Sequence, residues 1–572
     1  MSPTLKQPEQ SDQRRRRTLS HRRPPRRAAL ATALAALAAL AAGGCGAAAP
    51  AAAPATLVVE ANPVSPMADD FNPFEASSLG SEVGAVDLFY EPLLQWNITK
   101  ADSYYPWLAT GFAWNGNGTA ITFHIRSGVR WSDGTPLTAA DVAYTFQLMQ
   151  NNQALNAQAL PITGETSSGG EATITFSSPQ YTNLYAISGQ TFVVPEHIWR
   201  SRADPAGWSD PDPVGSGAYL LDTFNSQGFT LKVNPDYWGG RPKVAEISFP
   251  AYVSNAAANQ ALAAGQIDWA GNYVPGIQTA FVARDPAADH YWFPTTNTVS
   301  LIFNTAAAPF GDRAVRQAVN AGIDRSALAQ VGEGGYEPAA TSSSGLLMPE
   351  FAADVPVGMD DDLPSGSDET EVNSIMQEAG YAKDSAGVWA QNGVEVSFAI
   401  DEPSSYTDYY TDATLIAQQL QGLGFGVTVK SATVDSWTSD LATGSFQAAI
   451  RWGASGPTPY TQYEAWLDYG GSAPLGQNAG GDFGRYDNPA VQTALRTWAG
   501  TDNAAVITQQ INVIANAMTT DVPAAALLYG AGWTEYSTAK FTGWPTQSNS
   551  YINPQPNDPW DEYTVLHLVP AS

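Results

Sequence analysis

The sequence predicts a chain of α/β lobes, and two observations carry this prediction. Apolar strand and helix patterns alternate: residues 396–400 and 427–430 predict strands, and 411–423 between them predicts a helix that ends at Gly424. The chain is also 572 residues long, which exceeds the usual size of a single domain. We therefore expect two or three lobes, each built on its own core.

The N-terminus has the order of segments that is typical of a secretory signal peptide. Eight arginines within the first 27 residues precede an apolar run over 28–42, two glycines and Cys45. This apolar run is shorter than the ~20 residues that a bilayer-spanning helix needs. We predict a signal peptide over 1–44. A flexible tether is predicted over 45–55, because its Ala, Gly and Pro residues offer no material for a core.

Removal of the signal segment would leave a strongly acidic protein. The first 44 residues hold 9 basic and 2 acidic residues, which leaves 18 basic and 53 acidic residues and a formal net charge of −35. Such a surface repels nucleic acid and anionic lipid headgroups, so we expect no nucleic-acid partner. Cys45 is the only cysteine of the chain, so an intramolecular disulfide is impossible.

Residues 131–146 (WSDGTPLTAADVAYTF) form the most informative motif of the chain. The Ser-Asp-Gly part has turn chemistry. Thr138 stands three residues before Asp141, which predicts a capping box at the start of a helix. We expect this helix to pack on a core through one apolar face, formed by Val142, Phe146 and Met149.

The wording of this motif closely resembles the signature of the bacterial family-5 solute-binding proteins, the extracytoplasmic receptors of ABC importers for oligopeptides, dipeptides and some oligosaccharides. The resemblance covers nearly the whole exported chain and implies a periplasmic-binding-protein-like α/β fold (class II, cluster C). This fold has two main lobes with a hinge and an inserted subdomain. Further segments that resemble the family are the strand at 56–60, NPF at 72–74, a helix with the sequence DLFYEPLL at 87–94, VGSGAY at 214–219, NPDYWGG at 234–240, ALAAGQIDW at 261–269 and DRAVRQAVNAGIDR at 312–325.

The family fold, carried onto this sequence, implies that the chain enters its first lobe three times. Lobe I is expected over 56–88, 214–300 and 529–572, the inserted lobe II over 89–213, and lobe III over 301–528. Lobes that are joined by crossing segments suggest hinge closure around a ligand.

Cys45 resembles the cysteine of a bacterial lipobox, which is diacylated and becomes the mature N-terminus. This implies a protein held by a lipid anchor, and by no other membrane contact, at the outer face of the cytoplasmic membrane or in the equivalent periplasmic space. One departure is Ala42, because lipoboxes usually have Leu at this position. The alternative is an ordinary or chance cysteine, and the export route, Sec or Tat, stays open.

Sequence signatures of catalysis and of a resident metal or cofactor are absent. The five histidines are far apart and none forms HExxH, and the chain has no nucleophile elbow, P-loop or dinucleotide fingerprint. Glycosidase chemistry needs only two carboxylates, and the 55 acidic residues leave that interpretation open. We expect no enzyme, catalytic residue, cofactor or metal. A secreted hydrolase and a signalling or adhesion lipoprotein without an importer remain as alternatives.

Residues 447–463 resemble the segment that lines the family's cleft from the C-terminal lobe. In peptide-binding relatives a Trp in this segment is followed three residues later by an Asp that pairs with the free α-amino group of the peptide. Here Trp452 is retained, Ser455 takes the place of the Asp, and 447–463 contains no carboxylate. A buried ammonium without a partner costs several kcal/mol. The segment therefore favours a neutral oligosaccharide over an oligopeptide.

Three further segments, 268–273, 541–546 and 549–554, resemble the branch of the family that includes oligosaccharide binders. Core packing is the alternative for Trp269 and Tyr529. The implied partners are a small oligomeric ligand and an ABC permease/ATPase complex, with the protein itself a monomer. The candidate ligand-binding residues are Trp452, Ser455, Trp269, Asn272, Tyr529, Trp533 and Trp437.

The anchor can be tested with Cys45→Ser. We expect the variant to fold normally but to move from the membrane fraction to the medium, because a serine offers no thiol for lipid attachment. Cell fractionation and mass spectrometry of the N-terminal peptide measure this. A variant that stays in the membrane fraction, or a wild type without lipid, would show that Cys45 is not the anchor.

Overall fold

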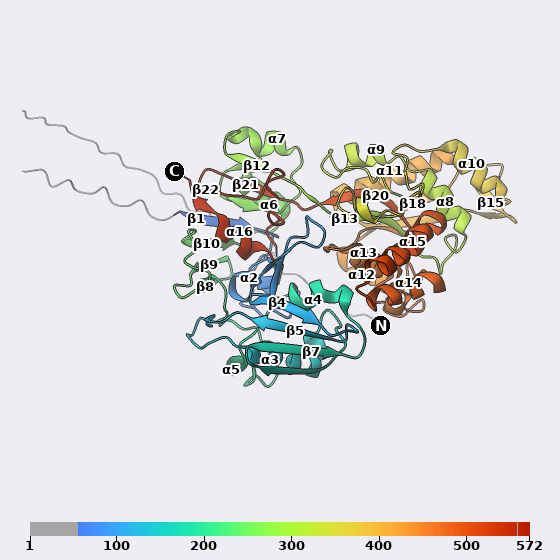
Figure 1. Cartoon of the computed structure of the whole chain (residues 1–572). Helices are drawn as coiled ribbons and strands as arrows, with labels where there is room; N and C mark the ends of the chain where they lie inside the picture. The colour runs from blue at the N-terminus through green and yellow to red at the C-terminus, as the bar shows by residue number, and fades with distance from the viewer. Residues whose placement is uncertain (1–54, 558, 572) are drawn as a thin grey trace, which may run out of the picture. The chain divides into compact units, whose positions relative to one another are not determined.

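The computed structural model describes residues 55–557 and 559–571, which lie in the compact unit Pro54–Ser572 (Figure 1). The predicted signal peptide over 1–44, most of the tether and the candidate lipidation site Cys45 lie outside the described residues. None of the described helices combines the length and the apolar character that a membrane crossing needs.

In the described part of the chain, segments far apart in sequence share a seven-stranded sheet, in the order β12-β21-β11-β1-β10-β9-β8. The central strand β1 (Thr56–Glu60) runs parallel to both of its neighbours, whereas every other pair in this sheet is antiparallel. The strand predicted over 56–60 is therefore confirmed. The other strands are β8 (Tyr219–Asn225), β9 (Gly228–Val233), β10 (Glu246–Pro250), β11 (Trp269–Ala270), β12 (Asp289–Tyr291) and β21 (Glu535–Ser537).

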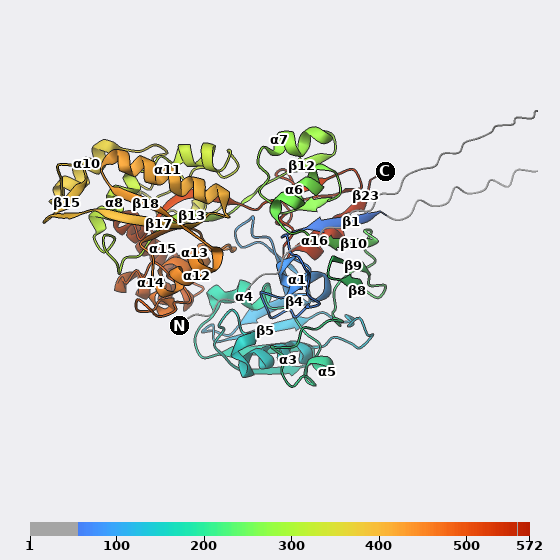
Figure 2. The same ribbon diagram turned by 180° about the vertical axis from the view of Figure 1, so that it is seen from behind.

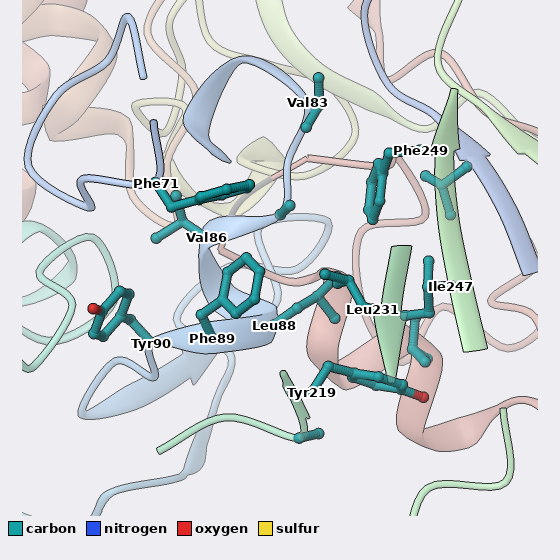
Figure 3. Close-up of a cluster of buried hydrophobic side chains, with 14 of the residues drawn as sticks. Phe71, Val83, Val86, Leu88, Phe89, Tyr90, Tyr219, Leu231, Ile247 and Phe249 are labelled. Carbon is teal, nitrogen blue, oxygen red and sulfur yellow. The ribbon is translucent and has the colours of Figure 1, made fainter. Parts of the chain in front are cut away.

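A hydrophobic core covers one face of this sheet and includes the single-turn helix α2 (Val86–Phe89). Figure 3 shows Phe89 and Phe71 grouped on one side, with Ile247 and Phe249 from β10 facing them. The rings of Phe71 and Phe89 meet edge to face, with centroids 5.3 Å apart, and such pairs add to the stability gained from burial alone.

The expectation of a helix over 87–94 is wrong, because only a single helical turn forms there. α2 ends at Phe89, and Tyr90 already has extended backbone angles. Pro92 explains the early end, because the residue before a proline is disfavoured in helical geometry and Glu91 occupies that position. The chain continues instead into the short strand β2 (Leu94–Trp96).

A five-stranded sheet in the order β18-β17-β19-β13-β20 forms the centre of the C-terminal part of the described chain. β17 is parallel to β18 and β19, whereas β13 is antiparallel to β19 and β20. The predicted strands at 396–400 and 427–430 are confirmed as β17, which begins one residue later, and β18. The strands are β13 (Thr295–Phe303), β17 (Ser397–Pro403), β18 (Gly426–Ala432), β19 (Ala448–Trp452) and β20 (Ala524–Ala531).

Separate hydrophobic cores cover the two faces of this sheet. Successive side chains of a strand point to opposite faces, and accordingly Leu301 belongs to one core and Ile302 to the other. In both Figure 1 and Figure 2, α11 lies on one side of the sheet and α13, α14 and α15 on the other. The helices of the first core are α8 (Arg313–Ala321), α10 (Glu369–Glu378) and α11 (Thr407–Leu423); those of the second are α12 (Val434–Thr443), α13 (Pro459–Leu467), α14 (Pro489–Ala499) and α15 (Ala504–Asp521).

The helix predicted over 411–423 is confirmed as α11, although it begins four residues earlier, at Thr407. It ends as expected, because Gly424 adopts a left-handed conformation with φ 97° that closes the last turn.

Another described sheet has four antiparallel strands and packs against α3 (Ala139–Asn151). The predicted capping box is confirmed. The Thr138 side chain accepts a bond from the first turn, while the Asp141 carboxylate accepts the Thr138 N–H at 2.8 Å. The apolar face predicted for the helix is buried. The strands of this sheet are β4 (Ala109–Trp114), β5 (Ala120–Ile125), β6 (Ile162–Ser168) and β7 (Glu171–Phe176).

The chain passes between the seven-stranded and five-stranded sheets in two short segments, 292–294 and 532–534, called the crossing segments below. They are bonded to each other, because Gly532 N–H donates to Pro294 O at 2.8 Å and Trp292 N–H donates to Thr534 O at 3.2 Å. The lobe limits predicted at 300 and 528 fall inside β13 and β20, which belong as whole strands to the five-stranded sheet. The division into lobes stays a prediction.

The remaining described α-helices and strands are short and connect or extend these sheets. They are α1 (Leu79–Glu82), β3 (Tyr104–Pro106), α4 (Leu184–Ser188), α5 (Glu196–Trp199), α6 (Asn255–Ala263), α7 (Ile277–Ala280), α9 (Arg325–Ala327), β14 (Ala382–Lys383), β15 (Trp389–Gln391), β16 (Val394–Glu395), β22 (Phe541–Thr542), α16 (Asp561–His567) and β23 (Val569–Pro570).

The capping box yields a stability prediction. Thr138→Ala should lower the free energy of unfolding by about 1 kcal/mol, because the first turn of α3 loses its side-chain acceptor. A matched control is Thr508→Ala in α15, where the hydroxyl only bonds back to Ala504 O. We expect this control to stay within about 0.5 kcal/mol of wild type. Denaturant unfolding followed by circular dichroism measures both, and equal effects would contradict the role of the cap.

Candidate functional site

A cavity of about 460 Å³ lies where strands of the seven-stranded and the five-stranded sheets end, and it is called the central cavity below. Residues 61–62 follow β1, 271–273 follow β11, 405–409 follow β17, and Trp452 is the last residue of β19. Because β1 is parallel to β11 and β17 is parallel to β19, carboxyl ends of strands from both sheets meet at this cavity. Ligands of open α/β sheets bind at such ends.

The antiparallel strands and a crossing segment complete the wall. β13 contributes its second and third residues, Thr296 and Asn297, and β20 contributes its last two, Gly530 and Ala531. Trp533 of the second crossing segment also lines the central cavity, and its ring packs against Phe293 with centroids 4.8 Å apart. A change in the relative position of the two sheets would therefore change the cavity.

Trp452 offers a fixed aromatic surface to the central cavity. Its side chain is 37% exposed, although three rings hold it. It stacks on Tyr409 at 6.3 Å and 25°, meets Tyr406 edge to face at 6.0 Å, and lies against Trp437 at 5.8 Å. An aromatic ring that is oriented by its neighbours but open on one side can stack on a ligand at small entropic cost.

The structure brings together four of the residues that the sequence singled out: Trp452, Ser455, Asn272 and Trp533 all line the central cavity. Their roles in binding stay predictions.

The other three candidates lie in hydrophobic cores and do not line the central cavity. Trp269 is 1% exposed and its indole N–H donates to Pro554 O at 2.9 Å. The Tyr529 hydroxyl accepts the Thr341 N–H at 3.0 Å inside the second core of the five-stranded sheet. Trp437 is buried beneath Trp452. For Trp269 and Tyr529 this is the core-packing alternative, since strands covered on both faces bury every side chain.

Asn272 is held in place by two buried carboxyl groups. Its side-chain amide donates to Glu60, and its backbone N–H donates to Glu535 Oε2 at 3.3 Å. Burial raises the pKa of Glu60 to about 7 and raises the pKa of Glu535 as well. These contacts fix the orientation of the amide at the cavity wall.

Two carboxyl groups that sequence reasoning missed, those of Glu337 and Asp408, also line the central cavity. Glu337 is anchored by Ala531 N–H, which donates to its Oε1 at 2.8 Å. Burial raises the pKa of both groups. The preference for a neutral ligand considered only the carboxylates of 447–463, whereas Glu337 and Asp408 reach the same wall from other segments; the ligand class stays a prediction.

A sequence signal for Asp408, though not for Glu337, does exist in α11. Asp408 and Asp412 continue, at a spacing of four, the row that Ile416 and Leu420 form on the buried face of this helix. Residues at this spacing lie one above the other on a helix. Two aspartates on an apolar face are therefore directed toward the core instead of the solvent.

A second cavity, of about 340 Å³, is lined from the four-stranded sheet region and from the helices of the second core. Its wall includes the aromatic residues Trp96, Trp114, Tyr181 and Trp498. It contains none of the candidate residues and does not lie at the ends of parallel strands, so we take the central cavity as the functional site.

Comparison with known proteins supports the fold. The structure is similar to that of a periplasmic oligopeptide-binding protein of an oligopeptide ABC transporter from Thermotoga maritima, with a TM-score of 0.81 and 24% identity, covering 90% of this chain and 99% of that one. The mannohexaose-bound form of that Thermotoga maritima protein gives a TM-score of 0.76 at 24% identity, with 90% and 98% covered. Protein XP55 of Streptomyces lividans is 27% identical over 388 residues, which are 66% of this chain and 67% of that protein.

The predicted fold class, α/β and periplasmic-binding-protein-like, is confirmed by these structures. The model of the family described as "Bacterial extracellular solute-binding proteins, family 5 Middle" matches residues 103–474, which is more than half of the chain. The chain therefore belongs to the bacterial extracellular solute-binding proteins of family 5.

Proposed function

We propose that this protein is the extracytoplasmic receptor of an ABC importer, and that it captures a short oligomeric solute in the central cavity and delivers it to the permease. The observation that carries the proposal is the meeting of strand ends from two sheets at one cavity, with the exposed ring of Trp452 in its wall. The family to which the chain belongs supports binding instead of catalysis.

Capture would use movement of the two sheets about the crossing segments. These segments are only three residues long each, and they are the places where the chain passes between the two sheets that line the central cavity. Few residues then need to change their backbone angles when the cavity opens or closes, which is the usual construction of a hinge.

The solute class proposed is a short oligosaccharide or a short oligopeptide. The Thermotoga maritima relative is named for oligopeptides and has also been crystallised with mannohexaose. The sequence favoured a sugar partly because 447–463 lacks a carboxylate. Since Glu337 and Asp408 lie in the cavity wall, this reason no longer separates a sugar from a peptide. Ligands of both classes have a flat or extended surface that could stack on Trp452. Both also carry polar groups that could form hydrogen bonds with the side-chain amides of Asn272 and Asn297.

Attachment through a lipid on Cys45, action as a monomer and pairing with a permease/ATPase complex complete the proposal. The signal-like segment, the small residues before Cys45 and the family membership support the first and the last of these. A neighbouring operon with two permeases and two ATPases would agree with import, whereas its absence would favour a signalling or adhesion lipoprotein.

Trp452→Ala tests the binding site. We expect the variant to bind its solute more weakly by about 1–3 kcal/mol, in the range for a buried aromatic anchor, while the melting temperature of the unliganded protein changes little. The solute is first found by thermal shift with oligosaccharide and peptide panels, since a ligand at 100 times its Kd adds about 2.7 kcal/mol of stability. Titration calorimetry then compares the proteins.

Tyr469→Ala is the matched control, because Tyr469 is 43% exposed and does not line the central cavity. It should leave the affinity unchanged. Wild-type affinity in Trp452→Ala, or an equal loss in both variants, would contradict the proposed site.

A further inference from the structure

The wall of the central cavity on the side of the five-stranded sheet contains five carboxyl groups, called the carboxyl cluster below. Two of them line the cavity and three lie directly behind, each with 0% of its surface exposed. They come from three segments of the chain that the fold brings together: the turn after α9, strand β17 and helix α11. The members are Glu337 and Asp408 at the cavity, and Glu333, Glu402 and Asp412 behind it.

The cluster has no countercharge. In residues 55–557 and 559–571, the salt bridges involve none of its five members. Neither carboxyl oxygen of Glu333, Glu402 or Asp412 has a hydrogen-bond partner of standard geometry, although the carboxyl groups of Glu333 and Asp412 interact with each other and the Ile450 N–H acts on Glu402. Buried polar groups are otherwise nearly always bonded, and a buried unpaired carboxyl costs several kcal/mol. Such an arrangement indicates a partner that comes from outside the chain.

The central cavity does not supply this partner from its own wall. None of the described residues that line it is Lys, Arg or His. Arg451 is adjacent to Trp452, but its guanidinium lies over the rings of Trp437, Trp452 and Phe483 and does not line the cavity.

The electrostatic effect of the carboxyl cluster reaches a side chain on the other side of the central cavity. Tyr273 lines the opposite wall, after β11, and its pKa is raised to about 12, first by burial and then by repulsion from Glu333 and Asp408. Within the cluster, burial followed by repulsion from Asp412 and Asp408 raises the pKa of Glu333 to about 10. Burial raises the pKa of Asp412 to about 8, although its interaction with Glu333 lowers it, and burial raises the pKa of Glu402 to about 9. A cation that enters the cavity would relieve these repulsions.

We propose that the carboxyl cluster is the subsite for a primary ammonium group of the solute, with Glu337 and Asp408 as its direct acceptors. This inference rests on the proposed function and specifies its ligand. The same chemistry is offered by the α-amino group of an oligopeptide and by the amino group of an amino-sugar oligomer. Both are extended molecules that could place an ammonium at the cluster and another part against Trp452.

Two observations favour an organic ammonium over a bare metal ion. No group of three or more His, Cys, Asp or Glu side chains in the described ranges has the geometry to hold a metal. The rings of Tyr406, Tyr409 and Trp452 lie in the wall beside Asp408, and aromatic faces attract ammonium groups.

The test is calorimetric titration of the purified protein with two matched pairs of probes and one neutral sugar. The pairs are tetra-alanine with N-acetyl-tetra-alanine, and the glucosamine tetramer with its fully N-acetylated form; mannohexaose is the neutral sugar. We expect a probe with a free ammonium to bind at least about tenfold more tightly than its acetylated partner, which is the effect of one hydrogen-bonded charge. The pair that shows the preference identifies the peptide or the amino sugar as the source.

The variants are Glu337→Gln and Asp408→Asn. Each should reduce the affinity for the ammonium probe about tenfold or more and leave the acetylated probe unchanged. The Glu337→Gln variant keeps a side-chain oxygen for Ala531 N–H, and Asp408 is only partly buried, so at least one variant should keep the wild-type melting temperature. The control Asp487→Asn, an exposed carboxyl outside the cavity, should bind like wild type.

A second measurement separates an ionic anchor from a general loss of fit. A bound ammonium favours the ionised form of the cluster, so binding should release protons, and the measured enthalpy should change with the ionisation enthalpy of the buffer. Tighter binding of mannohexaose or of the acetylated probes, with no effect of Glu337→Gln or Asp408→Asn, would overturn the ammonium subsite and leave the proposed function intact. Binding of none of the five probes would count against both.

Discussion

The pairing of the two crossing segments is the constraint on which the rest of the molecule depends. Two hydrogen bonds join 292–294 to 532–534 where the chain leaves one sheet for the other. This pairing holds the seven-stranded and five-stranded sheets with their carboxyl-terminal strand ends directed at a common cavity. Trp533 packs there between Phe293 and Tyr273, so the joint and the cavity wall share a side chain.

The two cores of the five-stranded sheet supply the stability that a polar cavity lacks. Residues such as Leu301 on one face and Ile302 on the other are almost completely removed from water. At about 25 cal/mol per Å² of buried apolar surface, cores of this size can offset several unfavourable polar groups at one end of the sheet. Polar residues without partners can therefore persist at the cavity, where a well-packed protein would otherwise exclude them.

Much of the local structure could be predicted from the sequence, because it depends on neighbours along the chain. The capping box at Thr138 and the helix end at Gly424 are local events, and both were predicted. The helix over 87–94 was expected from family resemblance alone, and it ends after one turn because Pro92 disfavours helical geometry at the residue before it.

The site was harder to predict, since it depends on which distant segments meet. Trp452 could be singled out through family resemblance, but nothing in its own segment reveals that Glu337 lies in the same wall, more than a hundred residues earlier in the chain. The burial of a candidate residue could not be predicted either. A tryptophan in a short strand, such as Trp269, has the same sequence context whether it lies in a cavity wall or in a core.

The unpaired carboxyl groups behind the cavity have a consequence for protein engineering. A procedure that optimises stability alone would replace Glu333, Glu402 and Asp412 with amide or apolar residues, since each is buried without a bonded partner. Such a design would melt at a higher temperature and would at the same time lose the ionisable carboxyl groups behind its ligand cavity. Stability design would therefore change these three residues first. Experiments that aim to alter ligand specificity should instead keep them or vary them deliberately.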